Sequence, residues 1–398
     1  MRNISSSNIA IISLYFLIFN LVFFPGHYCF YTMNTQFMSP TAETATQQVH
    51  DRTSCNDILC LAPNASYQVT MLFDKIIAGN VNRASKQSQA IGGKGQNFSI
   101  ATKQFYGHTN RVTLLQILGG HTGTQIENML LEQGIDCITV HTPLPTRTCT
   151  TCLDVSTNQM TELIGISNRV EEEVVAEYVD IATRLLHSGA PPRALTLCGT
   201  IPPGFNSERI AEIISSKTDK TLVFVDAAID ILPLLDTGKV DILKVNLSEL
   251  KIIASAVGLQ FNATQGIPPA ILELGKKIRV SIVAVTDGPF MAYLADIGQG
   301  TCHMFVIPDL LADKELFVGN LAEVKLEDEE KRVLNPIGAG DTCSSVTLNC
   351  LLDGAPAIDA FALGLAAASA SCLVPMINCI IDRVVMNKIR AMTTITQV

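Results

Sequence analysis

Several patterns that would point to other protein classes are missing from this sequence. It contains no G-x-x-x-x-G-K-[ST] loop, so it is not a P-loop enzyme. It has no basic stripe and a net charge of −9, so we expect no nucleic-acid partner. Its seven histidines are scattered, so they indicate no metal centre.

The twelve cysteines do not show the spacing of a disulfide framework. We expect most of them to be small buried hydrophobes in a reducing compartment. Cys149 and Cys152 form a C-x-x-C pair, which raises the question of a redox or zinc site. The surrounding pattern is that of a strand, where the two sulfurs would point to opposite faces, and no second Cys/His pair completes a site. We therefore reject both interpretations.

The N-terminus carries an apolar run from Ile9 to Phe24. A membrane-spanning helix needs about 20 apolar residues, so this run is short for a span and is typical of a signal-peptide core. The alternatives are a gene start placed too early, with the true start at Met33 or Met38, and a membrane anchor. We expect residues 1–52 to lie outside the fold and residues 53–398 to form the functional domain.

Three N-x-[ST] sequons bear on the compartment, because they fall in or beside the motifs described below. They begin at Asn64, Asn97 and Asn246. Glycosylation at these positions would block the predicted site. We therefore favour the cytosol or an organelle stroma over the secretory lumen.

The remainder of the chain alternates apolar strands with helical patterns. Such alternation predicts an α/β fold with a central, mostly parallel sheet and helices on both faces. The predicted strands of this sheet include residues 57–62, 111–118, 194–199, 222–226, 241–245 and 282–286.

A glycine-rich turn, residues 335–341 (N-P-I-G-A-G-D), opens a late apolar helix. The start of a helix has unpaired N–H donors and a partial positive charge, which suit an anion such as a transferring phosphoryl group. Asp341, in the first turn, could take a proton from a reacting hydroxyl. The simpler interpretation is an ordinary loop-to-helix turn with an aspartate near its cap.

A second glycine-rich element, residues 91–97 (I-G-G-K-G-Q-N), comes early in the chain. Its paired glycines allow the backbone to approach a ligand closely. Lys94 and Asn97 are three residues apart, so they can point the same way from a helix start. A glycine turn with a solvated lysine is the simpler alternative.

Together these motifs resemble the PfkB family of carbohydrate kinases in the ribokinase-like superfamily. The late turn is similar to that family's D-T-x-G-A-G-D, and the early element to its 1-phosphofructokinase and tagatose-6-phosphate kinase branch. C-G-T-I-P-P-G at 198–204 and N-L-S-E at 246–249 resemble two further motifs of the family. The resemblance implies a ribokinase-like fold, with a small β lid from strands within about 63–91 and 146–165.

The resemblance also implies an ATP- and Mg²⁺-dependent phosphorylation of a sugar phosphate, with Asp341 as catalytic base. It assigns the remaining roles to matching positions. The phosphates of ATP would meet Gly338, Ala339, Gly340, Asn246, Thr286 and Gly288. Mg²⁺ would be placed by Glu249 with Asn246, through water. The sugar phosphate would meet Gln68, Gly92, Gly93, Lys94, Asn97 and Arg147, with Lys94 and Arg147 on its existing phosphate.

One position departs from the family pattern. Gln68 stands where the family carries an aspartate that binds sugar hydroxyls, and an amide brings no charge. A ribokinase- or nucleoside-kinase-like enzyme acting on an unphosphorylated sugar therefore remains an alternative, as does a catalytically inactive sugar-binding homologue. The resemblance further suggests a homodimer through the lid. We expect the acidic segment 308–331 to be a surface insertion without chemistry.

Overall fold

The computed structural model describes residues 54–107, 109–260, 266–289, 291–312, 316, 334–374 and 376–398. They belong to a compact unit that runs from Gln48 to Val398. The predicted N-terminal extension, residues 1–52, lies outside the described residues, and so does most of the acidic segment 308–331. None of the helices described is long and apolar enough to cross a membrane.

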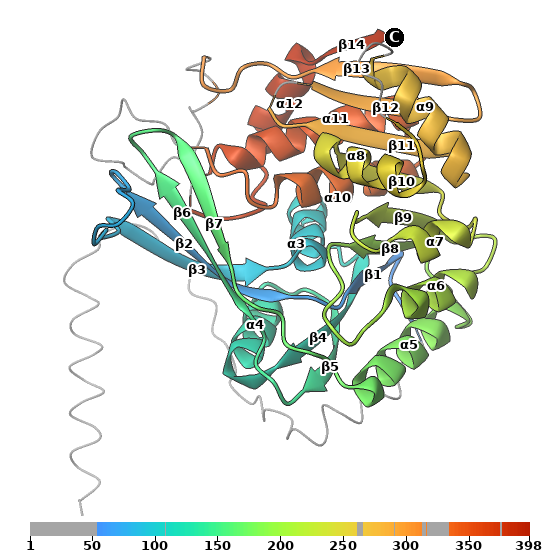
Figure 1. The fold of residues 1–398 in the computed structure, drawn as a ribbon, viewed down its shortest axis with the longest axis horizontal. Coiled ribbons are helices and arrows are strands. Elements are labelled where there is room, and N and C mark those ends of the chain that lie inside the picture. Colours follow the sequence, from blue (N-terminus) through green and yellow to red (C-terminus); the bar gives the residue numbers. More distant parts are fainter. Residues whose placement is uncertain are drawn as a thin grey trace, which may run out of the picture. The chain divides into compact units, whose positions relative to one another are not determined.

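A ten-stranded sheet forms the centre of the unit, in the order β14-β13-β12-β11-β10-β9-β8-β1-β4-β5 (Figure 1). Seven neighbouring strands are parallel, as the alternating pattern predicts: β1 Ile58–Ala62, β4 Val112–Gly119, β5 Cys137–Thr142, β8 Ala194–Cys198, β9 Leu222–Asp226, β10 Ile242–Asn246 and β11 Ile282–Asp287. Three antiparallel strands extend one edge: β12 Met291–Asp296, β13 Thr301–Val306 and β14 Thr394–Gln397.

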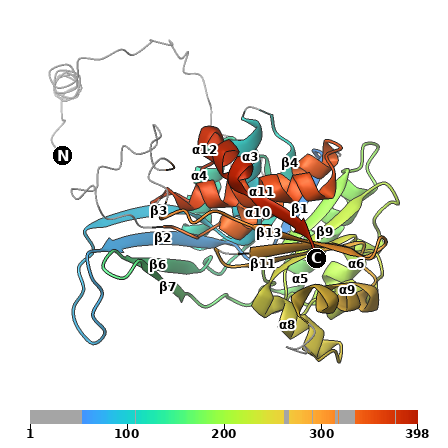
Figure 2. The ribbon, with the colours of Figure 1, turned by 90° about the horizontal axis from the view of Figure 1, so that it is seen from above.

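Helices cover both faces of this sheet (Figures 1 and 2). One face packs against α5 Glu172–Leu186, α6 Ser207–Ser215, α7 Leu232–Asp236, α8 Leu247–Ala256 and α9 Ile267–Ile278. The other packs against α3 Lys94–Tyr106, α4 Gly120–Glu132, α10 Ala339–Leu352, α11 Ala357–Cys372 and α12 Arg383–Met392. Because the parallel strands are buried on both faces, they appear in the sequence as continuous apolar runs.

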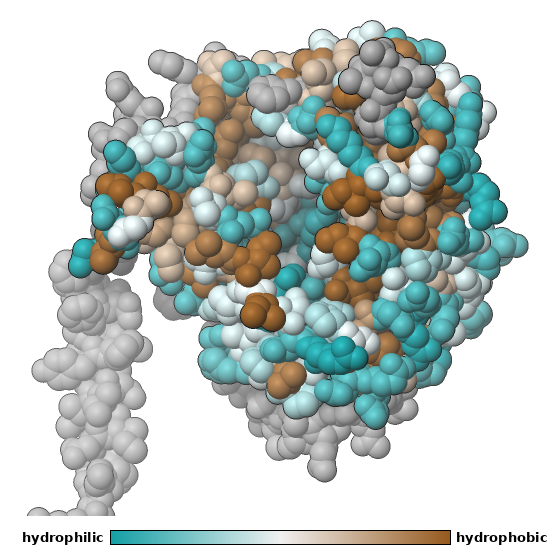
Figure 3. All heavy atoms as spheres, in the orientation of Figure 1, coloured by the Kyte–Doolittle hydropathy of each residue, from teal (hydrophilic) through white to brown (hydrophobic). Residues whose placement is uncertain are grey.

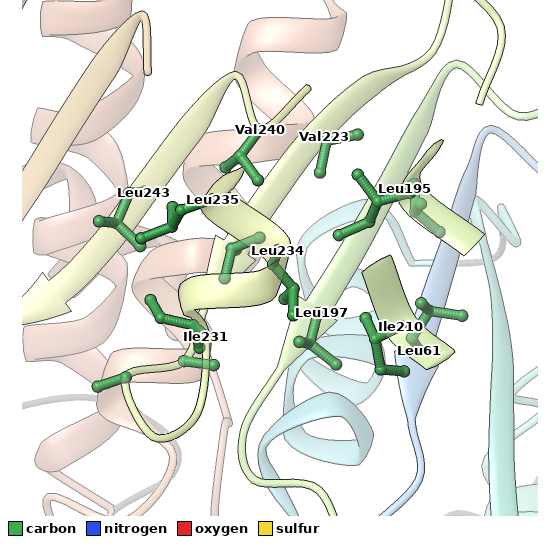
Figure 4. Packing of buried hydrophobic residues seen from close by; sticks show 14 of the residues in the cluster. Leu61, Leu195, Leu197, Ile210, Val223, Ile231, Leu234, Leu235, Val240 and Leu243 are labelled. Carbon is green, nitrogen blue, oxygen red and sulfur yellow. The ribbon is translucent and has the colours of Figure 1, made fainter. Parts of the chain in front are cut away.

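Figure 4 shows the packing on the first of these faces, where Leu197 of β8 and Leu61 of β1 lie against Ile210 of α6. Leu234 of α7 fills the space beside them, and all four side chains are buried. Complete burial of such a side chain contributes about 1.5–3 kcal/mol. This packing holds the strand ends rigidly, and the candidate site is built from those ends.

A separate four-stranded sheet forms the lid, in the order β3-β2-β6-β7 (Figure 2). Its strands are β2 Ser66–Phe73, β3 Lys86–Gly92, β6 Thr148–Asp154 and β7 Gln159–Ile164. The expectation of a small sheet from the N-terminal half is therefore confirmed. Strand β3 has the polar sequence K-Q-S-Q-A-I-G and lacks an apolar alternation. It forms because its backbone pairs with β2.

The C-x-x-C pair lies within β6, as the strand pattern indicates. Cys149 lies opposite Gln68 and Cys152 opposite Met71, at positions of unlike parity along the strand. Their side chains therefore point to opposite faces of the lid. Both cysteines are free thiols. In the part of the chain that the structure describes, no group of three or more His, Cys, Asp or Glu side chains is placed to hold a metal ion.

Candidate active site

The late glycine turn lies at the start of α10, at the carboxyl edge of the parallel strands. Gly338 is the N-cap and adopts a left-handed conformation, with φ of 76°. A Cβ atom at this position would lie 2.5 Å from Cys379 Sγ, so only glycine fits. The Ala339 N–H donates to the carbonyl of Pro336 at 3.1 Å and closes the turn. The next amides, those of Gly340 and Asp341, are at the positive end of the helix.

Asp341 is 5 % exposed, and its Oδ2 accepts a hydrogen bond from Asn97 Nδ2 at 2.8 Å. Burial and the nearby charge of Asp226 raise the pKa of Asp341 to about 7, although Lys94 and Lys244 partly oppose the rise. A carboxylate with a pKa near neutrality is well matched to accepting a proton at physiological pH.

Asn97 joins the early glycine-rich element to this turn. It is 5 % exposed on α3 and meets Asp341 across a sequence separation of 244 residues. An Asn97 amide buried in this way cannot carry a glycan in the folded protein. The sequon at Asn97 therefore has no role in the native fold.

Asp226, at the end of β9, was not predicted from the sequence, yet it connects the site. It is 1 % exposed, and its Oδ2 accepts from Lys244 Nζ at 2.9 Å and from Ser344 Oγ at 2.5 Å. Burial alone would raise the pKa of Asp226, but Lys244 and Lys94 outweigh it and lower the pKa to about 2. The carboxylate is therefore ionised at neutral pH.

Lys244, on β10, was also missed. Its Nζ donates to Asp226 and, at 3.1 Å, to the carbonyl of Gly340 in the turn before Asp341. Two signals were present in the sequence: a lysine within the buried strand I-L-K-V-N and an aspartate ending the buried strand L-V-F-V-D. A buried charge is rarely found without a partner.

The side chain of Lys94 faces carboxylates. Its Nζ lies 3.3 Å from Asp226 Oδ1 and 3.5 Å from Glu249 Oε1, and the pKa of Lys94 is raised, chiefly by Asp226. Gly93, which precedes it, has φ of 110°, and a Cβ there would lie 3.0 Å from the Cα of Ala65. Glycine is thus required for the lysine to begin α3 at this place.

Asn246 and Glu249 form a capping box at the start of α8. Asn246 Oδ1 accepts from the N–H of Glu249, and Glu249 Oε2 accepts from the N–H of Asn246, both at 2.8 Å. This N-x-x-E motif therefore has a structural role, and Glu249 Oε1 still faces Lys94. Thr286 pairs with Asn246 across β10 and β11, and Gly288 follows in a turn with open space around it.

Two predicted substrate residues lie in or beside the lid. Gln68 is 3 % exposed, and its Nε2 donates to Thr151 Oγ1 at 2.8 Å, so one amide donor is already used inside the lid sheet. Arg147 is half-buried, and its guanidinium donates to the carbonyls of Ala65 and Asn64, each at 3.4 Å. Gly92 ends β3 and packs against Ser66 and Gln68.

The structure thus brings most of the predicted residues to one sheet edge. A connected network joins Asn97, Asp341, Lys94 and Glu249 through the unpredicted Asp226 and Lys244. Among the described residues, Gln68 and Arg147 make no hydrogen bond or ion pair with this network. Figure 3 shows the surface hollowed over α3 and α10, between the lid and the ends of β9 and β10.

Comparisons with known proteins agree with this geometry. The pfkB family carbohydrate kinase profile matches residues 64–378, which is more than half of the chain. A tagatose-6-phosphate kinase of Staphylococcus epidermidis is 24% identical over 288 residues, 72% of this chain and 82% of that protein. A 1-phosphofructokinase of Bacillus subtilis is 24% identical over 315 residues, 78% of this chain and 90% of that protein.

Solved structures show the same fold at lower identity. Phosphofructokinase-2 of Escherichia coli, in complex with substrates and products, superposes with a TM-score of 0.70 at 20% identity, covering 84% of this chain and 98% of that one. Ribokinase of Giardia lamblia gives a TM-score of 0.63 at 14% identity, covering 85% and 99%. The fold is ribokinase-like, and the chain belongs to the pfkB family of carbohydrate kinases.

Proposed function

We propose that this kinase transfers the γ-phosphoryl group of ATP to a hydroxyl of a sugar that already carries a phosphate. The observation that carries the proposal is the buried Asp341, with its raised pKa, at the first turn of α10. Two relatives that match over most of the chain are named as kinases of phosphorylated ketohexoses. Arg147 supplies a cation suited to a substrate phosphate.

In the proposed reaction, Asp341 accepts the proton of the attacking hydroxyl as the new P–O bond forms and the bond to ADP breaks. Asn97 orients the Asp341 carboxylate through its 2.8 Å hydrogen bond. The amides of Gly340 and Asp341 lie at the start of α10, beyond the turn that the Ala339 N–H closes, and they would stabilise negative charge on the phosphoryl oxygens. Catalysis of this kind rests on positioning and charge stabilisation.

Two carboxylates near Lys94 offer oxygen ligands for a magnesium ion. Asp226 Oδ1 and Glu249 Oε1 converge within 3.5 Å of one ammonium group, so their oxygens already hold a cation. Oxygen ligands are those that Mg²⁺ prefers. Glu249 and Asp226 would hold the ion, with Asn246 and Thr286 beside it on the neighbouring strand ends. When bound with ATP, Mg²⁺ neutralises charge on the phosphates.

A homodimer through the lid is part of this proposal. All residues of β7 are exposed, and β7 is an edge strand, since none of the described strands lies beyond it in the lid sheet. Leu163, Ile164 and Ile166 are 58%, 62% and 89% exposed, which is unusual for large apolar side chains on one edge. Sedimentation of the parent and of Ile164→Lys would test this, because a lid dimer should dissociate in the variant.

We also propose that residues 53–398 suffice for catalysis and that the mature enzyme works in the cytosol or an organelle stroma. The experiment is a comparison of the full chain with a protein that starts at Thr53. Equal turnover by the two proteins would support the proposal that residues 53–398 suffice for catalysis, and loss of turnover in the shorter protein would contradict it. Fractionation of cells that express the full chain tests the compartment and would reveal a membrane anchor.

The substrate is tested by ATP turnover with two sets of acceptors. The first set is fructose 1-phosphate, fructose 6-phosphate and tagatose 6-phosphate. The second is fructose, ribose and a nucleoside. Turnover confined to the second set would favour the ribokinase-like alternative, for which the uncharged Gln68 is the motivating residue. A lack of turnover with every acceptor would favour an inactive sugar-binding homologue.

A further inference from the structure

A pocket without acidic side chains lies at the carboxyl ends of β1, β4, β5 and β8. Its polar lining includes Asn64, Thr146, Arg147, Ser167, Asn168 and Arg169. Of the described residues that line it, none is an aspartate or a glutamate. In a protein with a net charge of −9, a pocket with two arginines and no carboxylate attracts anions selectively.

Neither arginine is neutralised by an acidic partner within the described part of the chain. The polar contacts of Arg147 are the carbonyls of Ala65 and Asn64, at 3.4 Å each. Arg169 is exposed and makes no ion pair with any residue that the structure describes. Their guanidinium groups retain donors in the fork geometry that matches a phosphate.

The backbone around Arg169 is held on both sides. The N–H of Val170 donates to the carbonyl of Pro203 at 2.8 Å, and Asn168 Nδ2 donates to the carbonyl of Pro145 at 2.7 Å. Gly204 packs so closely that a Cβ there would lie 3.1 Å from Arg169 Cγ. The segment that carries Arg169 is therefore already fixed, which lowers the entropic cost of ordering it when a ligand binds.

The place of the pocket relative to the phosphoryl-transfer network follows from the strand order. Strands β1 and β4 lie two and three positions from β9, which carries Asp226. Neighbouring strands are spaced about 4.8 Å apart, so the pocket lies about 10–15 Å along the sheet edge. The long side chains of Arg147 and Arg169, together with a sugar whose reacting hydroxyl and phosphate lie at opposite ends, would bridge this separation.

We propose that Arg169 is a second arginine, beside Arg147, that grips the phosphate already present on the sugar and selects phosphosugars over free sugars. None of the motifs that identify the family assigns a role to Arg169. The inference rests on the proposed function, because it takes a sugar phosphate as the substrate of this site.

The test is calorimetric titration of the full chain with inorganic phosphate and with fructose 1-phosphate, fructose 6-phosphate and tagatose 6-phosphate. Arg169→Ala should weaken binding of the phosphosugars ten- to hundred-fold, the range for loss of a charge-assisted hydrogen bond. Arg169→Lys should retain part of the affinity, because it keeps the charge without the fork. The KM for ATP and the affinity for unphosphorylated fructose should not change.

Arg184→Ala is the matched control. Arg184 is an arginine of the adjoining helix α5 that pairs with Asp180 at 2.8 Å and does not line the pocket. If Arg169→Ala binds phosphosugars as tightly as Arg184→Ala does, the proposal is wrong. Comparing the far-ultraviolet circular dichroism of the variants ensures that both are folded.

The outcomes separate this proposal from the proposed function. Phosphosugar binding that depends on Arg169, without any ATP turnover, would support phosphate binding in the pocket and contradict the proposed kinase reaction on phosphosugars. If Arg169→Ala turns over a phosphosugar with the kcat/KM of the parent, the proposed reaction is supported and the phosphate-binding role of Arg169 is contradicted. If the parent binds none of the three phosphosugars and no phosphate, both are rejected.

Discussion

Asp341→Asn should remove catalysis and at the same time stabilise the protein. The substitution preserves the shape of the side chain, and its amide oxygen can still accept the hydrogen bond from Asn97. It removes the carboxylate in the first turn of α10. Loss of general-base assistance costs about 10²–10⁴-fold in rate. We expect kcat to fall by that factor while the KM for ATP stays close to that of the parent.

The stability effect follows from the pKa of Asp341. Burial and Asp226 raise this pKa from 3.8 to about 7, so the folded protein binds a proton more tightly than the unfolded chain. The folded state therefore loses stability relative to the unfolded state as the pH rises from about 4 to 7. Above pH 7 the cost is on the order of 4 kcal/mol. An asparagine does not have this cost.

The assay is urea unfolding of the parent and of Asp341→Asn at pH 4.5 and pH 8, together with kcat/KM over the same range. The variant should be clearly more stable at pH 8, and the difference should shrink toward pH 4.5. In the parent, kcat/KM should rise about tenfold between pH 6 and pH 8, as the carboxylate ionises. Equal stability at pH 8, or a flat pH–rate profile, would refute the assigned environment of Asp341.

Three further predictions concern its neighbours. Asp226→Asn leaves the buried Lys244 without its charge partner, so the free energy of unfolding, measured by denaturant melts, should fall by about 3–5 kcal/mol. The pH–rate profile of this variant should also move to lower pH, because Asp226 raises the pKa of Asp341. The pKa of Asp226 is lowered to about 2 in the folded protein. The stability that ionised Asp226 gives the parent should therefore be lost only as the pH falls from about 4 toward 2. Lys94→Ala should move the rate profile to higher pH, because Lys94 lowers the pKa of Asp341; an unshifted profile would separate Lys94 from the base. Gln68→Asp should change the ranking of kcat/KM across the phosphosugar panel in favour of fructose 1-phosphate, fructose 6-phosphate and tagatose 6-phosphate, and an unchanged ranking would show that Gln68 does not determine specificity.

Much of the fold follows from local patterns in the sequence. The parallel strands are readable because burial on both faces produces continuous apolar runs such as Leu222–Asp226, and α5 shows a clear helical period. The glycine turns are readable because only glycine adopts φ of 76° at Gly338 or 110° at Gly93. These signals depend on a few neighbouring residues, which is why they indicated the fold class, the glycine turns and the position of Asp341.

What the sequence left open depends on contacts between distant segments. The polar strand β3 exists only because β2 offers it a backbone partner. Lys94 meets Asp226 and Glu249 across separations of 132 and 155 residues, and Lys244 reaches Gly340 across 96. Arg169 enters an anion pocket because β1, β4, β5 and β8 end at one edge of the sheet. Periodicity reports which face of an element is buried, but only the tertiary structure decides which charges are buried together. Burial, and then the nearby charges, set the pKa of Asp341.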